Sequence, residues 1–471
     1  MSKGKYKELS KNTLLFSISS FGTKVISFLL VPLYTYVLST EEYGIVDILN
    51  TTISLLLPLL TLNIQDAVLR FTLDKDYEPE EVISAGVRVI SISSFFLMIV
   101  VLLIKSVGLL QIGWNYVGFL ILSFPLTAFM NSFSMYLRAR DRVSTIVVSG
   151  LTSTLLTCGL NLLFLLVLKI GVTGYLYAHV LASLVSAIYC FFAGKIYREL
   201  SMQIKKTIRK EMFVYSSPLI VNSLAWWLND ASDRYILTFF CGAALNGVYA
   251  VSYKIPTILS TVQSIFYNAW SVSAIKEFDE NDDDGFVGNI YSLYSCVSMI
   301  ACSILLLFNP VLTKLLYHSG EFYEAWRYAP ILLVGAIFNG ISLFEGCLFT
   351  AVKRTKDVSK TTLIGAGVNT LLNLCLIPII GAYGAAVATL VGYIVVWVVR
   401  TLVVRKIIRM RVNWVLQIIS SILMIVQGFF TALSNSMLIQ IVFLMFMIIL
   451  QKNFIIKTCK FVLDKVRHRV K

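Results

Sequence analysis

Three ionisable side chains lie within five positions of an otherwise apolar stretch, "AWWLNDASDRYIL" (225–237). Asp230 and Asp233 are carboxylates that can bind a proton or a sodium ion, and Arg234 offers a guanidinium to an anion such as a phosphate. Each such charge costs about 2.5–3.5 kcal/mol at the centre of a membrane helix, whereas a surrounding Leu, Ile, Phe or Val returns only about 0.3–0.6 kcal/mol. The three charges therefore cannot all face lipid.

The helical spacing of these residues indicates a shared polar face. At about 100° per residue, Asn222, Trp226, Asn229, Asp230, Asp233 and Arg234 fall within an arc of about 140°. Lys24 shares a face of about 120° with neighbouring hydroxyl side chains in the same way. We predict that both faces line a hydrated cavity; the alternative is that the charges form ion pairs that hold helices together. The substrate-binding candidates are Lys24, Arg88, Asn222, Trp226, Arg234 and Lys254, and the ion-coupling candidates are Asp230, Asp233 and Glu345.

The other groups of potentially reactive residues lack the spacing that catalysis, phosphate binding or metal binding requires. The three histidines are widely separated, and no phosphate-binding Walker A loop occurs. The acidic run "DENDDDG" (279–285) resembles a calcium loop, but Tyr291 stands where a bidentate Glu is required, so we interpret the run as a solvated cytoplasmic loop. The eight cysteines form no C-x-x-C pair and are interpreted as small buried hydrophobes. No catalytic residue, metal ligand or cofactor is predicted.

The composition indicates an all-α integral membrane protein. Hydrophobic residues make up 57%, charged residues 14%, and the mean hydropathy is +0.79. Continuous apolar runs of about 20 residues match the thickness of a bilayer, and they do not alternate as barrel strands do. The first run is longer than a signal-peptide core, so we expect it to be retained. We predict about 14 transmembrane helices, at 13–38, 45–66, 83–104, 114–136, 143–168, 172–193, 213–239, 244–266, 287–308, 328–350, 361–380, 382–404, 413–433 and 435–455.

The distribution of the net charge of +14 indicates how the chain is oriented in the membrane, and it does not indicate nucleic-acid binding. Lys and Arg concentrate in alternate loops that begin with the N-terminus and include 195–212, 400–411 and 452–471. The opposite loops hold only Lys105, Lys169, Lys314 and Arg327. By the positive-inside rule, both termini are expected in the cytoplasm.

The two halves of the sequence echo each other. The segment "NLLFLLVLKIGVTGYLYA" (161–178) parallels "NLCLIPIIGAYGAAVA" (373–388), and the basic turns 138–143 and 352–358 that precede them also correspond. Residues 39–49 match 241–253 in placement and glycine-aromatic character. A six-helix repeat predicts two lobes related by a pseudo-two-fold axis along the membrane normal. The expected parts are an N-terminal lobe (1–200), a C-terminal lobe (201–411), and two extra helices with a basic tail (412–471).

An ordered set of motifs resembles a known family. "PLYTYVLSTEEYG" (32–44), "RARDRV" (138–143), "SDRYIL" (232–237), "GVYAVSYKIP" (247–256) and "NAW" (268–270) resemble the bacterial polysaccharide-biosynthesis flippases of the Wzx type. These belong to the multidrug, oligosaccharidyl-lipid and polysaccharide exporter superfamily, with the multidrug-and-toxin exporters and the peptidoglycan-precursor flippase. The resemblance implies two lobes around a cavity whose wall carries cationic groups. Lys24, Arg234 and Lys254 are the positions of this chain that fit such a role. In the peptidoglycan-precursor relative two extra helices form a lipid-tail groove, which would suit the last two spans here.

The resemblance implies a transporter of the bacterial cytoplasmic membrane, not an enzyme. Its expected substrate is an undecaprenyl-pyrophosphate-linked oligosaccharide repeat unit of O-antigen or capsule, moved by alternating access and coupled to H⁺ or Na⁺. Expected partners are a polysaccharide polymerase and glycosyltransferases. One alternative is a multidrug cation antiporter of the same superfamily. Another is a membrane-embedded polymerase or acyltransferase, which the short outer loops and the isolated His179 disfavour.

Overall fold

The protein is helical wherever its structure is described. The computed structural model describes residues 22–276, 278–317, 320–352, 354–434 and 436–452, and no strand occurs within these ranges. The chain divides into two compact units, Met1–Trp227 and Leu228–Lys471. This confirms the all-α class.

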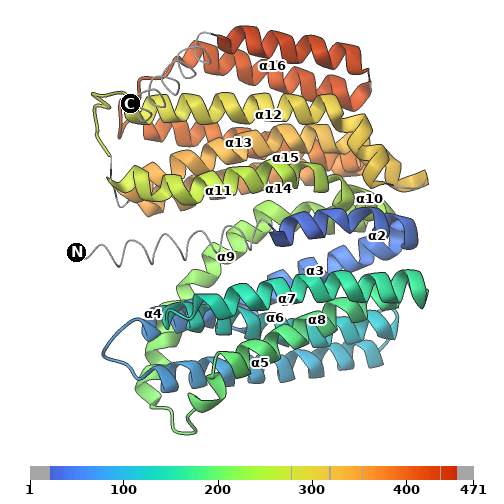
Figure 1. Cartoon of the computed structure of the whole chain (residues 1–471), viewed down its shortest axis with the longest axis vertical. Coiled ribbons are helices and arrows are strands. Elements are labelled where there is room, and N and C mark those ends of the chain that lie inside the picture. Colours follow the sequence, from blue (N-terminus) through green and yellow to red (C-terminus); the bar gives the residue numbers. More distant parts are fainter. Residues whose placement is uncertain (1–21, 277, 318–319, 353, 435, 453–471) are drawn as a thin grey trace, which may run out of the picture. The chain divides into compact units, whose positions relative to one another are not determined.

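In the first unit, α6 is the helix around which the others gather. It packs against α3, α4, α5, α7 and α8, which run roughly along one another (Figure 1). Large apolar side chains such as Phe95, Ile99 and Leu103 stay exposed along α5, as expected of a surface that meets lipid. The helices of this unit are α2 (Val31–Val37), α3 (Thr40–Leu60), α4 (Ile64–Thr72), α5 (Pro79–Ser106), α6 (Trp114–Ala139), α7 (Val143–Asn161), the π-helix η1 (Leu162–Val167), α8 (Gly171–Ala193) and the short η2 (Ile196–Arg198). Helix α9 (Lys206–Cys241) begins here and ends in the second unit.

In the second unit, α13 takes the central place. It packs against α10, α11, α12, α14, α15 and α16, and most of its length is buried. Glycines permit this close approach: a Cβ on Gly340 would lie 2.3 Å from the Gln263 amide nitrogen. Figure 1 shows α16 running beside α12. The helices are α10 (Ala243–Ser252), α11 (Lys254–Lys276), α12 (Phe286–Leu316), η3 (Gly320–Glu324), α13 (Ala325–Ala351), α14 (Thr355–Ile380), α15 (Ala382–Val404) and α16 (Trp414–Leu433).

Buried glutamines attach the C-terminal helices to the second unit. The Gln417 side chain accepts a hydrogen bond from Ser295 on α12 at 2.9 Å, and Gln427 accepts one from Ser303 at 3.0 Å. Gln427 also donates to Gln440 at 3.0 Å, in the apolar helix Met437–Lys452. Because polar side chains lack water partners in hydrocarbon, such bonds hold membrane helices together.

The helices confirm a multi-pass membrane protein. Among the described residues, ten helices are long and apolar enough to cross a bilayer. The other four expected spans correspond to the shorter apolar helix Gly22–Val37, the charged helix α9, the α10–α11 pair, and the helix Met437–Lys452. Residues 13–21 of the first expected span, and 435 and 453–455 of the last, lie outside the described residues. The count of fourteen crossings stays a prediction.

Three expected spans are interrupted rather than continuous. Span 45–66 gives way to two helices because Leu62 and Asn63 adopt positive φ angles of 57° and 52° between α3 and α4. Span 244–266 breaks at Tyr253, where Pro256 has no N–H to donate to the carbonyl of Ser252. The end of span 143–168 is the π-helix η1. Such interruptions are common where membrane helices line functional sites.

The internal repeat is visible in the backbone of matching turns. Arg142 is the N-cap of α7 with φ −92° and ψ 47°, and Arg354 is the N-cap of α14 with φ −95° and ψ 46°. Each arginine N–H donates to the carbonyl five residues earlier, on Leu137 and Phe349, at 2.8 Å. The arginines that precede α7 and α14 therefore share one backbone conformation.

The glycine pairs of the repeat also have matching roles. Gly171 and Gly381 both have φ of +57°, a conformation that glycine adopts at little cost. Three residues later, a Cβ on Gly174 would lie 2.8 Å from the Phe164 side chain, and one on Gly384 would lie 2.6 Å from the backbone of Leu376. Small residues are therefore required where α8 and α15 begin against the helices that precede them.

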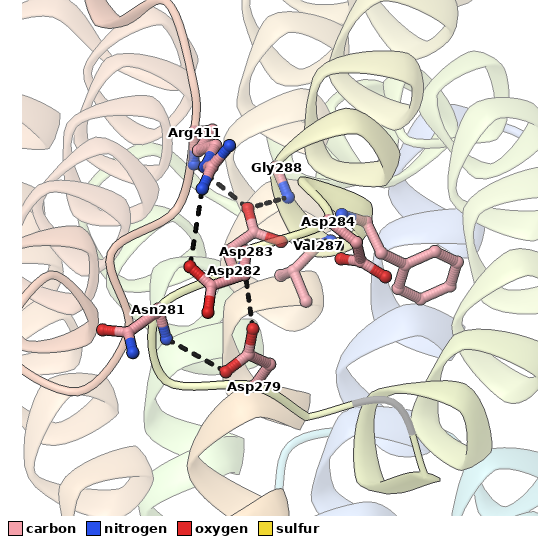
Figure 2. Close-up of polar contacts among 9 residues, drawn as sticks. Asp279, Asn281, Asp282, Asp283, Asp284, Val287, Gly288 and Arg411 are labelled. Atoms are coloured by element: carbon pink, nitrogen blue, oxygen red, sulfur yellow. Dashed lines mark hydrogen bonds and ion pairs between the residues drawn. The ribbon is translucent and has the colours of Figure 1, made fainter.

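Most of the acidic run 279–285 is exposed, as expected of a solvated loop, but Asp282 departs from that expectation. Asp282 is fully buried, and its carboxylate accepts hydrogen bonds from the Val287 and Gly288 N–H groups in the first turn of α12, both at 2.9 Å. The same carboxylate accepts the Arg411 N–H at 3.1 Å, and Asp283 pairs with the Arg411 guanidinium at 3.5 Å (Figure 2). A carboxylate suits the positive end of a helix. Asp282 thus fastens the segment before α16 to α12.

Candidate functional site

Asp233 lies at the centre of a buried polar cluster. Its side chain is 2% exposed, and its Oδ2 accepts hydrogen bonds from the hydroxyls of Tyr249 at 2.7 Å and Tyr253 at 3.1 Å. Thr389 of α15 donates to the same oxygen at 3.5 Å, and the Arg234 N–H donates to Oδ1 at 2.9 Å. Because a buried carboxylate needs donors in place of water, these groups make Asp233 tolerable inside an apolar unit.

Asparagines extend the cluster into α14. The Asn369 amide donates to the Thr389 hydroxyl at 3.4 Å, and Asn373 donates to Asn369 Oδ1 at 2.8 Å. All three side chains are buried. A chain of polar groups therefore runs from α14 through α15 to the carboxylate of Asp233 on α9.

Asp230 and Arg234 line an open cavity beside this cluster. The cavity has a volume of about 220 Å³, and its wall includes Tyr253, Thr389 and Tyr393. Asp230 is exposed, and its Oδ1 accepts hydrogen bonds from Tyr393 and Asn229, each at 3.3 Å. The rest of the lining is formed by Pro256, Thr257, Ser260, Leu332, Ala336 and Asn339.

The arginine is held over an aromatic ring. The guanidinium carbon of Arg234 lies 5.3 Å from the ring centroid of Tyr253, within the range of a cation–π contact. The cavity thus presents a cation, an accessible carboxylate and several hydroxyls. Carboxylate and hydroxyl oxygens suit a hard cation or a proton, and the guanidinium suits an anionic oxygen.

Glu345 belongs to a different cluster. It is fully buried on α13, and its Oε1 accepts a hydrogen bond from Thr401 of α15 at 2.7 Å. The neighbouring Arg400 is 1% exposed and donates to the Thr361 and Thr362 hydroxyls at 3.1 and 3.0 Å, and to the Ser342 carbonyl at 2.6 Å. The lining of the 220 Å³ cavity does not include Glu345.

The remaining candidates divide between the two units. Lys254 is partly buried and begins α11, two residues before the cavity-lining Pro256. In the first unit, Lys24 is exposed on the helix Gly22–Val37, and Asn222 is exposed on α9. Trp226, also in this unit, is partly buried. Arg88 is exposed on α5 and donates to the Met202 carbonyl at 3.4 Å. A residue with a purely structural role makes the same kind of contact, so the bond of Arg88 to the segment before α9 does not by itself indicate substrate binding.

Several functional groups were not singled out by sequence reasoning. Tyr249 and Tyr253 stand one helical turn apart in "GVYAVSYKIP" (247–256), and this spacing indicates that they share a helix face. The sequence does not indicate their partner, because the carboxylate that they contact is on another helix. Thr389 and Tyr393 show the same spacing on α15. The sequence around Arg400 does not indicate that its side chain is buried, because Arg400 stands near the end of an apolar run and is followed by the arginines of a loop.

Comparison with known proteins agrees with this architecture. Residues 9–270 match a family model described as "Polysaccharide biosynthesis protein". Two uncharacterized membrane proteins of Methanocaldococcus jannaschii are similar. One is 25% identical over 238 residues, which are 48% of this chain and 46% of that protein; the other is 21% identical over 423 residues, 85% and 98% respectively. This chain thus spans about half the length of the first relative.

Solved transporter structures share the fold. The lipid II flippase MurJ in an inward closed conformation is similar with a TM-score of 0.71 at 14% identity, over 96% of this chain and 100% of that one. An inward-facing multidrug resistance MATE family transporter of the MOP superfamily gives a TM-score of 0.65 at 15% identity, over 81% and 94%. At such identities the likeness concerns the fold.

Proposed function

This chain belongs to the polysaccharide biosynthesis protein family, and we propose that it is a flippase for undecaprenyl-pyrophosphate-linked oligosaccharide repeat units. It moves them across a bacterial cytoplasmic membrane by alternating access, for the assembly of surface polysaccharide such as O-antigen or capsule. The observation that carries the proposal is the cavity lined by Asp230, Arg234 and hydroxyl side chains inside an apolar helical unit. Charges are retained at such a place when they act on a substrate or an ion.

The chemistry of the substrate requires cationic groups along its path. A diphosphate sugar headgroup cannot enter hydrocarbon with its charge unpaired. We assign the neutralisation of the diphosphate to Arg234 together with Lys24 and Lys254, because guanidinium and ammonium groups form strong charge-assisted bonds with phosphate oxygens. Arg88, Asn222 and Trp226 are proposed to contact the sugars or the headgroup.

Ion coupling is assigned first to Asp233. Its carboxylate is buried among hydroxyl oxygens of Tyr249, Tyr253 and Thr389, so a proton or sodium ion arriving there would find oxygen ligands already in place. Asp230, which is exposed in the cavity, is the proposed route of entry for the ion. Glu345 lies in a separate buried cluster with Thr401, and we propose that it takes part in ion coupling from that position.

The decisive experiment is transport by the reconstituted chain. Proteoliposomes that hold a fluorescent undecaprenyl-pyrophosphate oligosaccharide should show protein-dependent movement of the headgroup between leaflets. Arg234→Ala and Lys254→Ala should slow this movement about tenfold or more, because each removes a charge-assisted contact of about 1.5–3 kcal/mol. Arg327→Ala is the matched control, since Arg327 forms an exposed ion pair with Glu324 that contributes little.

The competing function is a multidrug cation antiporter, and one observation favours it. The exposed carboxylate of Asp230 in the cavity offers a partner to an organic cation. The same proteoliposomes distinguish the two: uptake of organic cations with no movement of the lipid-linked glycan would refute the flippase. Complementation of surface polysaccharide in a flippase-deficient strain provides the cellular readout.

A further inference from the structure

A second polar cavity occupies the equivalent place in the first unit. It has a volume of about 260 Å³ and is lined by α3, α6 and α8. These helices correspond in the internal repeat to α10–α11, α13 and α15, which line the cavity of the second unit together with α9. Figure 1 shows α3, α6 and α8 close together in this unit.

The correspondence holds residue by residue. Asn50, Ile53, Ser54 and Leu57 of α3 stand at one constant sequence spacing from Tyr253, Pro256, Thr257 and Ser260, the spacing that also relates Gly44 to Gly247. On α8, His179 and Ser183 are spaced from Thr389 and Tyr393 of α15 as Gly174 is from Gly384. On α6, Phe119 and Ser123 are likewise spaced equally from Leu332 and Ala336 of α13, whereas Thr127 stands one position away from the equivalent of Asn339. The repeat therefore places most of the same positions in both pockets.

The two pockets differ in charge. The cavity of the second unit includes Asp230 and Arg234, whereas the described lining of the first unit has no carboxylate, ammonium or guanidinium. Its polar groups are an amide, an imidazole and four hydroxyls, and the buried ring of Phe119 forms an apolar wall. The polar lining side chains are Asn50, Ser54, Ser123, Thr127, His179 and Ser183.

We propose that this first-unit cavity binds one uncharged sugar ring. The inference rests on the proposed flippase function, whose substrate carries sugars beside a charged diphosphate. A sugar hydroxyl both donates and accepts, as do the hydroxyl, amide and imidazole groups of this lining, while the Phe119 ring can pack against the apolar face of a pyranose. A volume of about 260 Å³ is below the roughly 300–1,000 Å³ of drug-sized pockets, so it suits a single ring.

Thr127 is the side chain through which the site can be tested. Its hydroxyl donates to the Ser123 carbonyl at 2.7 Å, which leaves the oxygen lone pairs to accept from a sugar. Thr154 on α7 donates to the Gly150 carbonyl at 2.9 Å in the same way and is outside the cavity lining. Thr127→Val and Thr154→Val are therefore matched variants with the same loss of a back-bonded hydroxyl.

Binding is measured on the purified full chain by saturation-transfer difference NMR. Glucose and N-acetylglucosamine are the neutral probes, and glucose 1-phosphate is the anionic comparator. Dissociation constants of about a millimolar are expected, because a few hydrogen bonds replace bonds to water. Thr127→Val should weaken the binding of the neutral sugars about tenfold, while Thr154→Val should not change it. Ser183→Ala provides a second, smaller change should Thr127→Val fail to give monodisperse protein.

Each outcome decides the proposal. Neutral sugars that bind equally to wild type, Thr127→Val and Ser183→Ala would overturn it, and so would a wild type that binds no neutral sugar or prefers the sugar phosphate. In these cases, movement of the lipid-linked glycan by wild-type proteoliposomes would leave the flippase proposal standing. If neutral sugar binds and depends on Thr127 while the glycan is not moved, the cavity assignment stands and the flippase proposal fails.

Discussion

Asp233→Asn should abolish ion-dependent transport without destabilising the protein. The substitution keeps the size and shape of the side chain and removes its negative charge. In the structure the Asp233 carboxylate accepts hydrogen bonds from Tyr249, Tyr253, Thr389 and the backbone N–H of Arg234. A residue that serves only to hold helices together would be needed for stability, whereas a residue that binds an ion is needed for coupling.

The expected change in unfolding free energy follows from these contacts. A hydrogen bond to a charged group contributes about 1.5–3 kcal/mol and one between neutral groups about 0.5–1.5 kcal/mol, so the bonds from Tyr249 and Tyr253 lose about 1 kcal/mol each. The amide also avoids the desolvation of a buried ion, which costs several kcal/mol. The asparagine Nδ2 cannot accept a hydrogen bond, so the bond from the Arg234 N–H, worth about 1.5–3 kcal/mol, is lost as well. The gain is of the same size as the total loss of about 4 kcal/mol, so Asp233→Asn should unfold close to the wild-type temperature.

Asp233→Ala is the contrasting variant. The Tyr249 and Tyr253 hydroxyls lie 3.1 Å apart, so one can donate to the other when the carboxylate is removed. The second hydroxyl is then left without an acceptor, at a cost of about 1–3 kcal/mol, in addition to the cost of the cavity. The alanine variant should therefore lose both stability and transport.

The assay combines two measurements on the same preparations. Thermal unfolding in detergent reports stability, and movement of the lipid-linked glycan in proteoliposomes under imposed proton and sodium gradients reports coupling. We expect the asparagine variant to unfold normally and to show no response to either gradient. A less stable Asp233→Asn protein that still responds to the gradient as wild type does would refute the coupling role and leave Asp233 as a structural tie.

Three further predictions concern packing, each followed by thermal unfolding. Gly384→Ala should cost about 1–3 kcal/mol, because its methyl group would meet the preceding helix backbone; Gly367→Ala, with open space around the new Cβ, should cost nothing. Gln427→Leu should lose about 1–3 kcal/mol, because it removes the bonds with both Ser303 and Gln440; unchanged stability would contradict a role of Gln427 in holding these helices together. Arg400→Lys should cost about 3 kcal/mol, since an ammonium cannot reproduce two forked, charge-assisted bonds.

Local rules of the helix predicted part of the candidate site. The spacing of Asp230, Asp233 and Arg234 places them on one face of α9, and the structure brings all three to one cavity and the cluster beside it. The partners of Asp233 were out of reach of this reasoning. Tyr249 is 16 residues away and Thr389 is 156 residues away, and periodicity within one helix does not say which helices meet.

Other features escaped because their environment is set by tertiary packing. Arg400 stands among apolar residues followed by loop arginines, and only the threonines of α14 and the Ser342 carbonyl make its burial possible. Asp282 lies in an acidic run whose composition predicts exposure to solvent, yet its carboxylate accepts hydrogen bonds from the Val287 and Gly288 N–H groups in the first turn of α12. The π-helix Leu162–Val167 has no signal in its run of apolar letters.

The backbone of the repeat and the lining of its two cavities place different demands on the sequence. The backbone demands of the repeat are fixed: Gly174 and Gly384 must lack a Cβ, and Arg142 and Arg354 occupy the same turn conformation. The lining side chains carry no such backbone demand, so His179 can stand in one unit where the equivalent position in the other holds a threonine that donates to Asp233. Differences in substrate among proteins of this fold should therefore be found at the lining positions of the two cavities, which is where substitutions intended to change substrate should be made.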